Sequence, residues 1–143
     1  MILPLIKGLV LTIKRFLNPN TCVTMQYPDE RPQLSSRFRG LPELQIDKDG
    51  RERCIACGLC AKVCPSQCIY VEGASDEETQ RRYPKIYELD ASRCIFCGFC
   101  EEACPARAIM LRDTFELSSY ASKDIFDKEK LLGLTRKRNI KIQ

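Results

Sequence analysis

Eight of the ten cysteines lie in two copies of one pattern, C-x-x-C-x-x-C-x-x-x-C-P. Three thiolates at intervals of three residues hold one [4Fe–4S] cluster, and the fourth, before the proline, ligates the other cluster in two-cluster proteins. The spacing therefore predicts two [4Fe–4S] clusters with crossed ligation and a function in electron transfer. The expected ligands are Cys54, Cys57, Cys60 and Cys104 for cluster 1, and Cys94, Cys97, Cys100 and Cys64 for cluster 2.

Two other uses of closely spaced cysteines fit this sequence less well. A secreted disulfide scaffold would need a signal peptide, and the first residues, Met1 to Pro4, lack the basic region and cleavage site of one. A zinc ribbon usually separates two C-x-x-C pairs instead of running them together. The sequence contains no histidine, which excludes Rieske-type ligation, Cys/His zinc fingers and histidine-based acid–base chemistry. No catalytic residue is expected.

Two cysteines remain outside the motifs. Cys68 aligns with Ala108 in the other half, so the repeat gives it no ligand role, and we expect a buried, small apolar residue there. Cys22 lies far from either motif, and we interpret it as structural.

The cysteine motifs belong to an internal repeat with an offset of 40 residues, because residues 53–69 align without gaps on residues 93–109. Each half needs the other to complete its cluster. The repeat predicts an α+β fold with a pseudo-two-fold core like that of two-cluster bacterial ferredoxins. Strands are expected over 43–47, 68–72, 85–90 and 108–112, short helices over 59–64 and 99–104, and a polar, solvated loop over 73–82.

Residues around the cysteines suit a buried cluster. Gly58 and Gly98 follow the second cysteine of each motif, where the absence of a Cβ lets the backbone turn tightly. Backbone N–H groups in such turns can donate to cluster sulfurs and raise the reduction potential. We expect six apolar side chains to form a sleeve that excludes water: Ile55, Ile69, Ile95, Phe96, Phe99 and Ile109.

The flanking segments differ from the repeat. Residues 1–17 have apolar side chains at helical spacing, interrupted by Lys7, Lys14 and Arg15, which predicts an amphipathic helix on a membrane surface or membrane subunit. The stretch is too short and too charged to span a bilayer. Residues 18–42 carry four prolines, which predicts an extended arm that lies along a partner. The resulting domains are 1–17, 18–42, the ferredoxin-like domain 43–118, and a C-terminal tail, 119–143, in which residues 122–134 could form a helix.

Size and charge agree with a metal-stabilised domain. With 143 residues the chain buries a modest core, so we expect the cluster-free chain to be largely unfolded. The formal charge of +4 omits the clusters. Eight thiolates and two cubane cores together add roughly −4, which brings the total close to zero and gives no reason to expect nucleic-acid binding.

With the motifs in place, the chain resembles the ferredoxin-like subunit I of NADH:quinone oxidoreductase, respiratory complex I. The similarity covers roughly residues 24–118. The cysteine motifs alone fit any two-cluster ferredoxin. The segments before and between them make the resemblance specific to subunit I. The matching stretches are Tyr27–Glu30, Arg37–Gly40, Glu52–Cys57, Tyr83-Pro84 and Ser92–Pro105.

This resemblance implies an electron relay in the peripheral arm of a proton-translocating complex. Electrons would arrive from an upstream cluster subunit fed by flavin and leave toward the terminal cluster at the quinone site. The helix of residues 1–17 would contact a membrane subunit. The implied location is peripheral, on the cytoplasmic face of the bacterial inner membrane.

Three alternatives stay open from the sequence. A soluble two-cluster ferredoxin would share the core, although the arm and the basic ends argue against a free shuttle. The equivalent subunit of a membrane hydrogenase or of a ferredoxin-fed complex would have the same relay chemistry. A purely structural iron–sulfur protein would hold clusters that never accept an electron.

Overall fold

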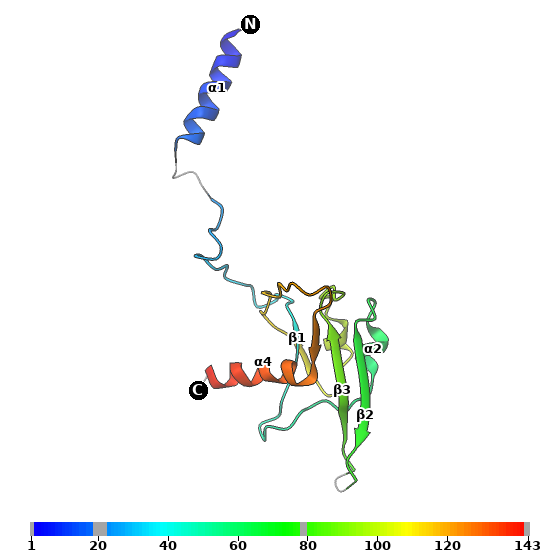
Figure 1. Cartoon of the computed structure of the whole chain (residues 1–143). Coiled ribbons are helices and arrows are strands. Elements are labelled where there is room, and N and C mark those ends of the chain that lie inside the picture. Colours follow the sequence, from blue (N-terminus) through cyan, green and yellow to red (C-terminus); the bar gives the residue numbers. More distant parts are fainter. Residues whose placement is uncertain (1, 19–22, 78–79, 142–143) are drawn as a thin grey trace. The chain divides into compact units, whose positions relative to one another are not determined.

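The computed structural model describes residues 2–18, 23–77 and 80–141. The chain divides into two compact units, Met1–Leu34 and Ser35–Gln143, and Figure 1 labels their elements. Cys22 lies outside the described residues, so its predicted structural role stays a prediction.

The first unit contains helix α1, Ile2–Phe16, where the apolar periodicity predicted a helix. Every described residue of α1 is exposed, including large apolar side chains such as Leu5 and Leu9. Lys14 and Arg15 lie in its last turn, where positive charge complements the helix dipole. Residues 23–34 form no helix or strand. None of the described helices is long and apolar enough to cross a lipid bilayer.

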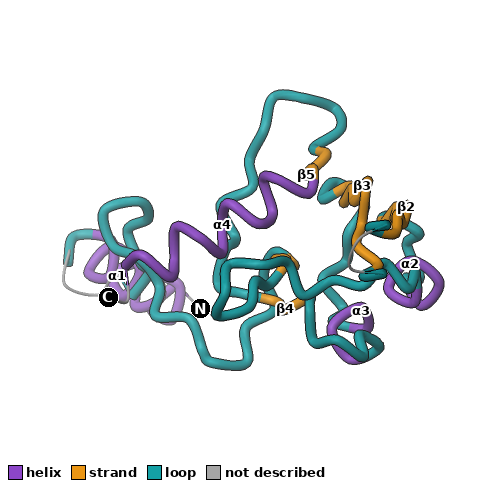
Figure 2. The backbone as a smooth tube through the Cα atoms, turned by 90° about the horizontal axis from the view of Figure 1, so that it is seen from below, coloured by secondary structure: helices purple, strands orange, loops and turns teal. Residues whose placement is uncertain are grey.

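The second unit is built on the predicted duplication. Strand β1, Pro42–Leu44, pairs antiparallel with β4, Ile109–Leu111, in the register Pro42↔Leu111. Strand β2, Ile69–Ser75, pairs antiparallel with β3, Arg82–Asp90. Helices α2, Leu59–Val63, and α3, Phe99–Glu102, contact each other and lie on the same side of the strands (Figure 2). The expected helices and strands therefore form, with shifted ends.

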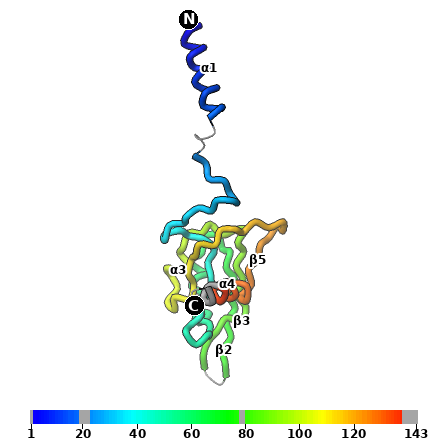
Figure 3. The backbone as a smooth tube through the Cα atoms, turned by 90° about the vertical axis from the view of Figure 1, so that its left-hand side faces the viewer, coloured from blue at the N-terminus to red at the C-terminus, as the bar shows by residue number. Residues whose placement is uncertain are grey.

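The hairpin of β2 and β3 is longer than the sequence predicted. Gly73, Ala74 and Ser75 were expected in a solvated loop, but they continue β2 after a bulge between Glu72 and Gly73. The distal end of the hairpin extends away from α3 and α4 (Figure 3). Its residues are mostly exposed, and a polar strand solvated on both faces lacks the alternation by which strands are recognised.

The C-terminal segment also differs from the prediction of one helix over 122–134. Residues Ile125–Asp127 form strand β5, which pairs antiparallel with β3 in the register Leu89↔Phe126. Helix α4, Lys128–Lys141, follows directly. A β-branched and an aromatic side chain complete the free edge of β3 here, which is a tertiary effect that local helix propensity cannot report.

Helix α4 packs on the ferredoxin-like core. Leu131 and Leu132 are buried in the same cluster as Leu44 of β1. The Thr135 hydroxyl donates to the carbonyl oxygen of Leu44 at 2.8 Å. At the start of the helix, Lys128 donates to the carbonyl oxygen of Pro84 at 2.9 Å. The strand–helix segment from Ile125 is thus part of the packed unit.

One carboxylate lies inside this core. Glu43 of β1 is 1% exposed. Its Oε1 accepts from the Thr114 hydroxyl at 3.1 Å, and its Oε2 lies 3.4 Å from the Thr135 hydroxyl. A buried carboxylate is tolerated when hydrogen bonds replace those of water. The Thr114 hydroxyl supplies one such bond, and the Thr135 hydroxyl, whose shorter bond goes to Leu44, lies at the edge of hydrogen-bond distance from the other oxygen. Glu43 thereby joins β1 to residue 114 and to α4.

Candidate iron–sulfur centres

The two cysteine loops have the same backbone conformation. We define the first cysteine loop as residues 54–60 and the second as residues 94–100. Left-handed backbone occurs at matching positions 40 residues apart, which are Ala56 and Phe96, Gly58 and Gly98, and Gln67 and Arg107. Non-glycine residues adopt this conformation only where the surroundings hold it. The duplication seen in the sequence is therefore also a duplication of local geometry.

Turned backbone of this kind directs N–H groups at sulfur. The Phe96 N–H donates to Cys94 Sγ at 3.5 Å, and the Ala108 N–H donates to Cys104 Sγ at 3.2 Å. Backbone hydrogen bonds of the same type involve Cys54 and Ala56, as well as Cys60 and Ala61. Donors aimed at a thiolate favour its charged form and add to the binding of a negative cluster.

The eight motif cysteines surround two hollows in a crossed arrangement. The first cavity has about 310 Å³ of empty space, open to solvent, and is lined by Cys54, Cys57, Cys60 and Cys104. The second cavity has about 340 Å³ and is lined by Cys64, Cys94, Cys97 and Cys100. In the described part of the chain no three Cys, Asp or Glu side chains converge to hold one metal ion. The linings of the two cavities show that each hollow combines three thiols of one cysteine loop with the cysteine that precedes proline in the other half.

The chemistry of these donors fits iron–sulfur clusters. All nine cysteines in the described ranges are free thiols. Thiolates are soft ligands that hold the iron of such clusters. Four thiols around a hollow, with backbone N–H groups directed at the sulfur atoms, match the needs of a cubane that is bound at four corners and carries negative charge.

Burial favours the protonated form of four of the motif thiols. It raises the pKa of the Cys60 thiol to about 11 and the pKa of the Cys100 thiol to about 12. Burial also raises the pKa of Cys54 and of Cys94. Because iron binds the thiolate form, cluster binding must displace these protons.

Cys68 lies closer to a site than the sequence indicated. Its Sγ is 3.4 Å from Cys64 Sγ, and it belongs to the lining of the second cavity. Burial raises the pKa of the Cys68 thiol, and the contact with Cys64 adds to this effect. Burial opposes ionisation of Cys64 too, but hydrogen bonds from the Cys68 backbone and thiol outweigh it and lower the pKa of Cys64. Cys68 is buried as expected, and its thiol lies within hydrogen-bond distance of a motif cysteine, to which it can donate when that cysteine is a thiolate.

The predicted apolar sleeve is only half formed. Ile69 and Ile109 are buried, and Phe96 is half-buried. Ile55, Ile95 and Phe99 are exposed, at 41%, 63% and 47%. The prediction that all six exclude water was wrong for these three, because each cysteine loop runs along the surface of the unit and turns those side chains outward.

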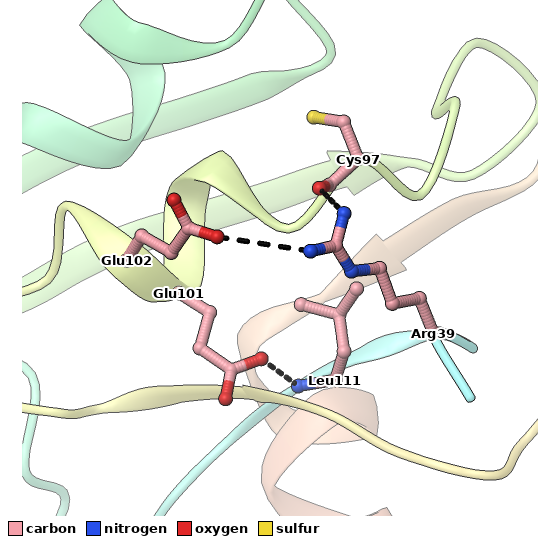
Figure 4. Close-up of polar contacts among 5 residues, drawn as sticks. All are labelled: Arg39, Cys97, Glu101, Glu102 and Leu111. Carbon is pink, nitrogen blue, oxygen red and sulfur yellow. Dashed lines mark hydrogen bonds and ion pairs between the residues drawn. The ribbon is translucent and has the colours of Figure 1, made fainter. Parts of the chain in front are cut away.

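Two residues near the sites were missed by the sequence reasoning. Tyr87 of β3 is 2% exposed, and its phenol is hydrogen bonded to Cys60 and also lies near Cys100. Burial raises its pKa well above the usual range, and the neighbouring thiols add to this. Arg39 lies against the second cysteine loop, where its guanidinium donates to the carbonyl oxygen of Cys97 (Figure 4). Both side chains reach the cysteines only through tertiary packing. The one signal in the sequence is that Arg39 lies in Arg37–Gly40, a stretch that matches the subunit I family.

Comparisons with known proteins agree with this geometry. The 4Fe-4S dicluster domain family matches residues 53–116. NADH-quinone oxidoreductase subunit I 1 of Geobacter sulfurreducens is 52% identical over 134 residues, which cover 92% of this chain and 98% of the relative. NADH-quinone oxidoreductase subunit I 2 of Geobacter metallireducens is 48% identical over the same shares of the two chains.

A solved structure supports the fold. A chain of the membrane-bound sulfane sulfur reductase, an archaeal respiratory membrane complex, aligns with a TM-score of 0.54 and 24% identity. The alignment covers 93% of this chain and 66% of that chain. From the domain match, the paired cavities and the relatives of nearly equal length, we conclude that the chain belongs to the NADH-quinone oxidoreductase subunit I family and is an electron-transfer subunit with two [4Fe–4S] clusters.

Proposed function

We propose that the chain relays single electrons between two crossed clusters within an NADH-quinone oxidoreductase. The observation that carries this proposal is the lining of the two cavities, each of which joins one cysteine loop to the proline-linked cysteine of the other half. The proposed ligands are Cys54, Cys57, Cys60 and Cys104 for cluster 1, and Cys94, Cys97, Cys100 and Cys64 for cluster 2. When bound, each [4Fe–4S] cluster supplies a one-electron couple.

The protein's own residues hold the two sites close together and prepare them for charge. Helices α2 and α3, which carry Cys60 and Cys100, contact each other directly. The Phe96 and Ala108 N–H groups donate to ligand sulfurs and so favour the extra negative charge of a reduced site. A relay needs no general base or nucleophile, and rigid ligands limit the reorganisation that electron transfer requires.

Redox partners would dock over the cysteine loops. Ile55 and Leu59 are exposed beside the first cavity, and Ile95 and Phe99 are exposed at the matching places beside the second. Apolar side chains at such positions are suited to contacts that exclude water from a site. We propose that one patch receives the upstream cluster subunit and the other faces the subunit with the terminal cluster at the quinone site.

Helix α1 would attach the chain to the membrane part of the complex. Its apolar side chains are exposed, and three cationic residues share the helix with them, a combination that favours an interface or the surface of a membrane subunit. The corresponding location is the cytoplasmic face of the bacterial inner membrane. Removal of residues 2–17 should leave both clusters in place and release the chain from membranes. A truncated chain that still assembles and supports quinone reduction would contradict this attachment.

Paired cysteine variants test the crossed ligation. Cys54→Ser and Cys104→Ser should alter the same EPR signal of the reduced, cluster-loaded chain, although the two residues lie in different halves. Cys94→Ser and Cys64→Ser should alter the other signal. Cys68→Ala is the matched control, because it removes a thiol from the lining of the second cavity and should leave the iron content unchanged.

The pattern of lost signals decides the assignment. If Cys104→Ser altered the signal that depends on Cys94, each motif would serve a single cluster and the crossed arrangement would be wrong. A cluster-loaded chain that accepted no electron from a strong reductant would overturn the relay itself and favour a structural role.

A further inference from the structure

Arg39 ties the end of the extended arm to the second cysteine loop. Its guanidinium donates to the carbonyl oxygen of Cys97, one of the cysteines that line the second cavity. A second nitrogen of the same group lies 3.7 Å from a carboxylate oxygen of Glu102 in α3. Figure 4 shows the guanidinium between these two partners. A fixed positive charge therefore lies beside one of the two cysteine loops.

Among the described residues, no guanidinium contacts the corresponding glycine of the first cysteine loop, and the Arg81 guanidinium instead donates to the Glu52 carbonyl oxygen before that loop. The repeat pairs Gly98 with Gly58, so the surroundings of these glycines can be compared directly. A Cβ built on Gly98 would lie 3.3 Å from the guanidinium carbon of Arg39. A Cβ built on Gly58 would meet no atom of the described residues within 4 Å. Where the second half has Glu102, the first half has Lys62. The two loops share a backbone conformation and differ in the guanidinium that contacts Gly98.

The backbone next to Arg39 is anchored. The Gly40 N–H donates to the Arg112 carbonyl oxygen at 2.7 Å, and the Leu41 N–H donates to the Thr114 carbonyl oxygen at 2.9 Å. Close by, the Glu101 carboxylate accepts from the Leu111 N–H at 2.9 Å (Figure 4). These bonds fix the base of the Arg39 side chain, so the guanidinium is held at the loop although its side chain is half exposed.

We propose that Arg39 raises the reduction potential of cluster 2. The inference rests on the proposed relay and ligand assignment. Reduction adds one negative charge to a site, and a nearby cation favours the more negative state. Arg39 therefore makes cluster 2 a better electron acceptor than it would be without this cation. In the transfer, one electron leaves cluster 1, which is oxidised, and enters cluster 2, which is reduced, and no bond or proton changes.

Glu102 works in the opposite direction. Its carboxylate lies against the guanidinium and offsets part of the positive charge. Neutralising this residue should therefore raise the potential of cluster 2, whereas neutralising Arg39 should lower it. Opposite shifts from two neighbouring residues are a stronger test than a loss from either alone.

The test is a redox titration of the full-length, cluster-loaded chain, followed by EPR, which reports both clusters in one sample. Arg39→Gln should shift the reduction equilibrium of cluster 2 by about threefold to tenfold toward the oxidised form, where tenfold corresponds to about 59 mV. Cluster 1 should stay nearly constant. Arg39→Lys should show a smaller shift, because it keeps the charge and loses the planar fork. Glu102→Gln should shift cluster 2 toward the reduced form.

Arg37→Gln is the matched control, since it removes an equal charge from an exposed residue two positions earlier. The proposal is overturned if Arg39→Gln moves both clusters equally, or if Arg37→Gln moves cluster 2 as far. If the Arg39→Gln variant does not bind cluster 2, the shifts of cluster 2 in Glu102→Gln and Arg39→Lys still test the proposal. Iron content and the number of EPR signals in the unaltered chain report separately on the relay, so its failure cannot be confused with a failure of Arg39.

Discussion

Gly40 lies where the extended arm enters the packed unit, and its replacement by alanine should detach the arm. The glycine is buried, and its N–H donates to the Arg112 carbonyl oxygen. A Cβ at this position would lie 2.5 Å from the Thr114 carbonyl oxygen and closer still to that of Arg112. Both are backbone atoms, so no side-chain rotation relieves the overlap. The chain must move by about 1 Å to restore ordinary contact.

The cost follows from these contacts. Moving residue 40 away breaks or weakens two backbone hydrogen bonds, from Gly40 to Arg112 and from Leu41 to Thr114, each worth about 1 kcal/mol. Residual overpacking adds about 1–3 kcal/mol. A total of about 3 kcal/mol raises the opening equilibrium of this segment by about a hundredfold.

Hydrogen exchange followed by mass spectrometry measures that opening directly. In cluster-loaded Gly40→Ala, amides of residues 40–44 and 111–114 should exchange about a hundredfold faster. The amides of the β2–β3 hairpin should change little, because the hairpin belongs to the other sheet. The iron content should stay complete, since no cysteine is altered.

Gly133→Ala is the control, because it makes the same glycine-to-alanine substitution at another position. Gly133 lies inside α4, and a Cβ there would meet no described atom within 4 Å. Alanine in a helix interior should stabilise α4 by about 0.5–1 kcal/mol. Unchanged protection of residues 40–44 in Gly40→Ala would refute the close approach of the two backbones and, with it, the anchoring of Arg39.

Three further predictions concern the core. Tyr87→Phe removes a donor to Cys60 worth about 1.5 kcal/mol, so the reduction equilibrium of one cluster should fall by up to about tenfold in an EPR-monitored titration; equal potentials would mean that the phenol does not act on the thiolate. Thr135→Val should lower the free energy of unfolding in urea by about 1–3 kcal/mol, because Leu44 and Glu43 lose a buried partner; an unchanged midpoint and slope would contradict this. Removal of iron by a chelator should abolish most far-UV circular dichroism of the ferredoxin-like unit, and a spectrum that persists would show that the core folds without its clusters.

The sequence indicates more of the candidate site than of the surrounding fold, because the spacing of the cysteines is a local feature. Cys54, Cys57 and Cys60 lie within one turn of chain and a short helix, so their spacing alone indicates a shared site. The repeat then paired the halves and indicated matched turns at Gly58 and Gly98. Each of these conclusions depends on residues close in sequence, where backbone geometry leaves few choices.

Elements that depend on distant partners escaped this reasoning. Ile125 and Phe126 form a strand only because β3 offers a free edge, 35 residues or more away in the chain. Helix α4 has a weak apolar pattern, and its docking depends on Leu131, Leu132 and a hydroxyl that meets Leu44. The contacts of Arg39 with Cys97 and of Cys68 with Cys64 likewise depend on tertiary packing.

Two differences between the halves lie at the second site. Duplication alone would give two equal clusters, between which an electron has no preferred direction. The second cysteine loop has the Arg39 cation, and the second cavity has the thiol of Cys68, whose counterpart in the repeat is Ala108. Both a cation and an S–H donor favour added negative charge. Because both act on the same member of a pseudo-symmetric pair, the proposed effects of the cation and the thiol on cluster 2 would add.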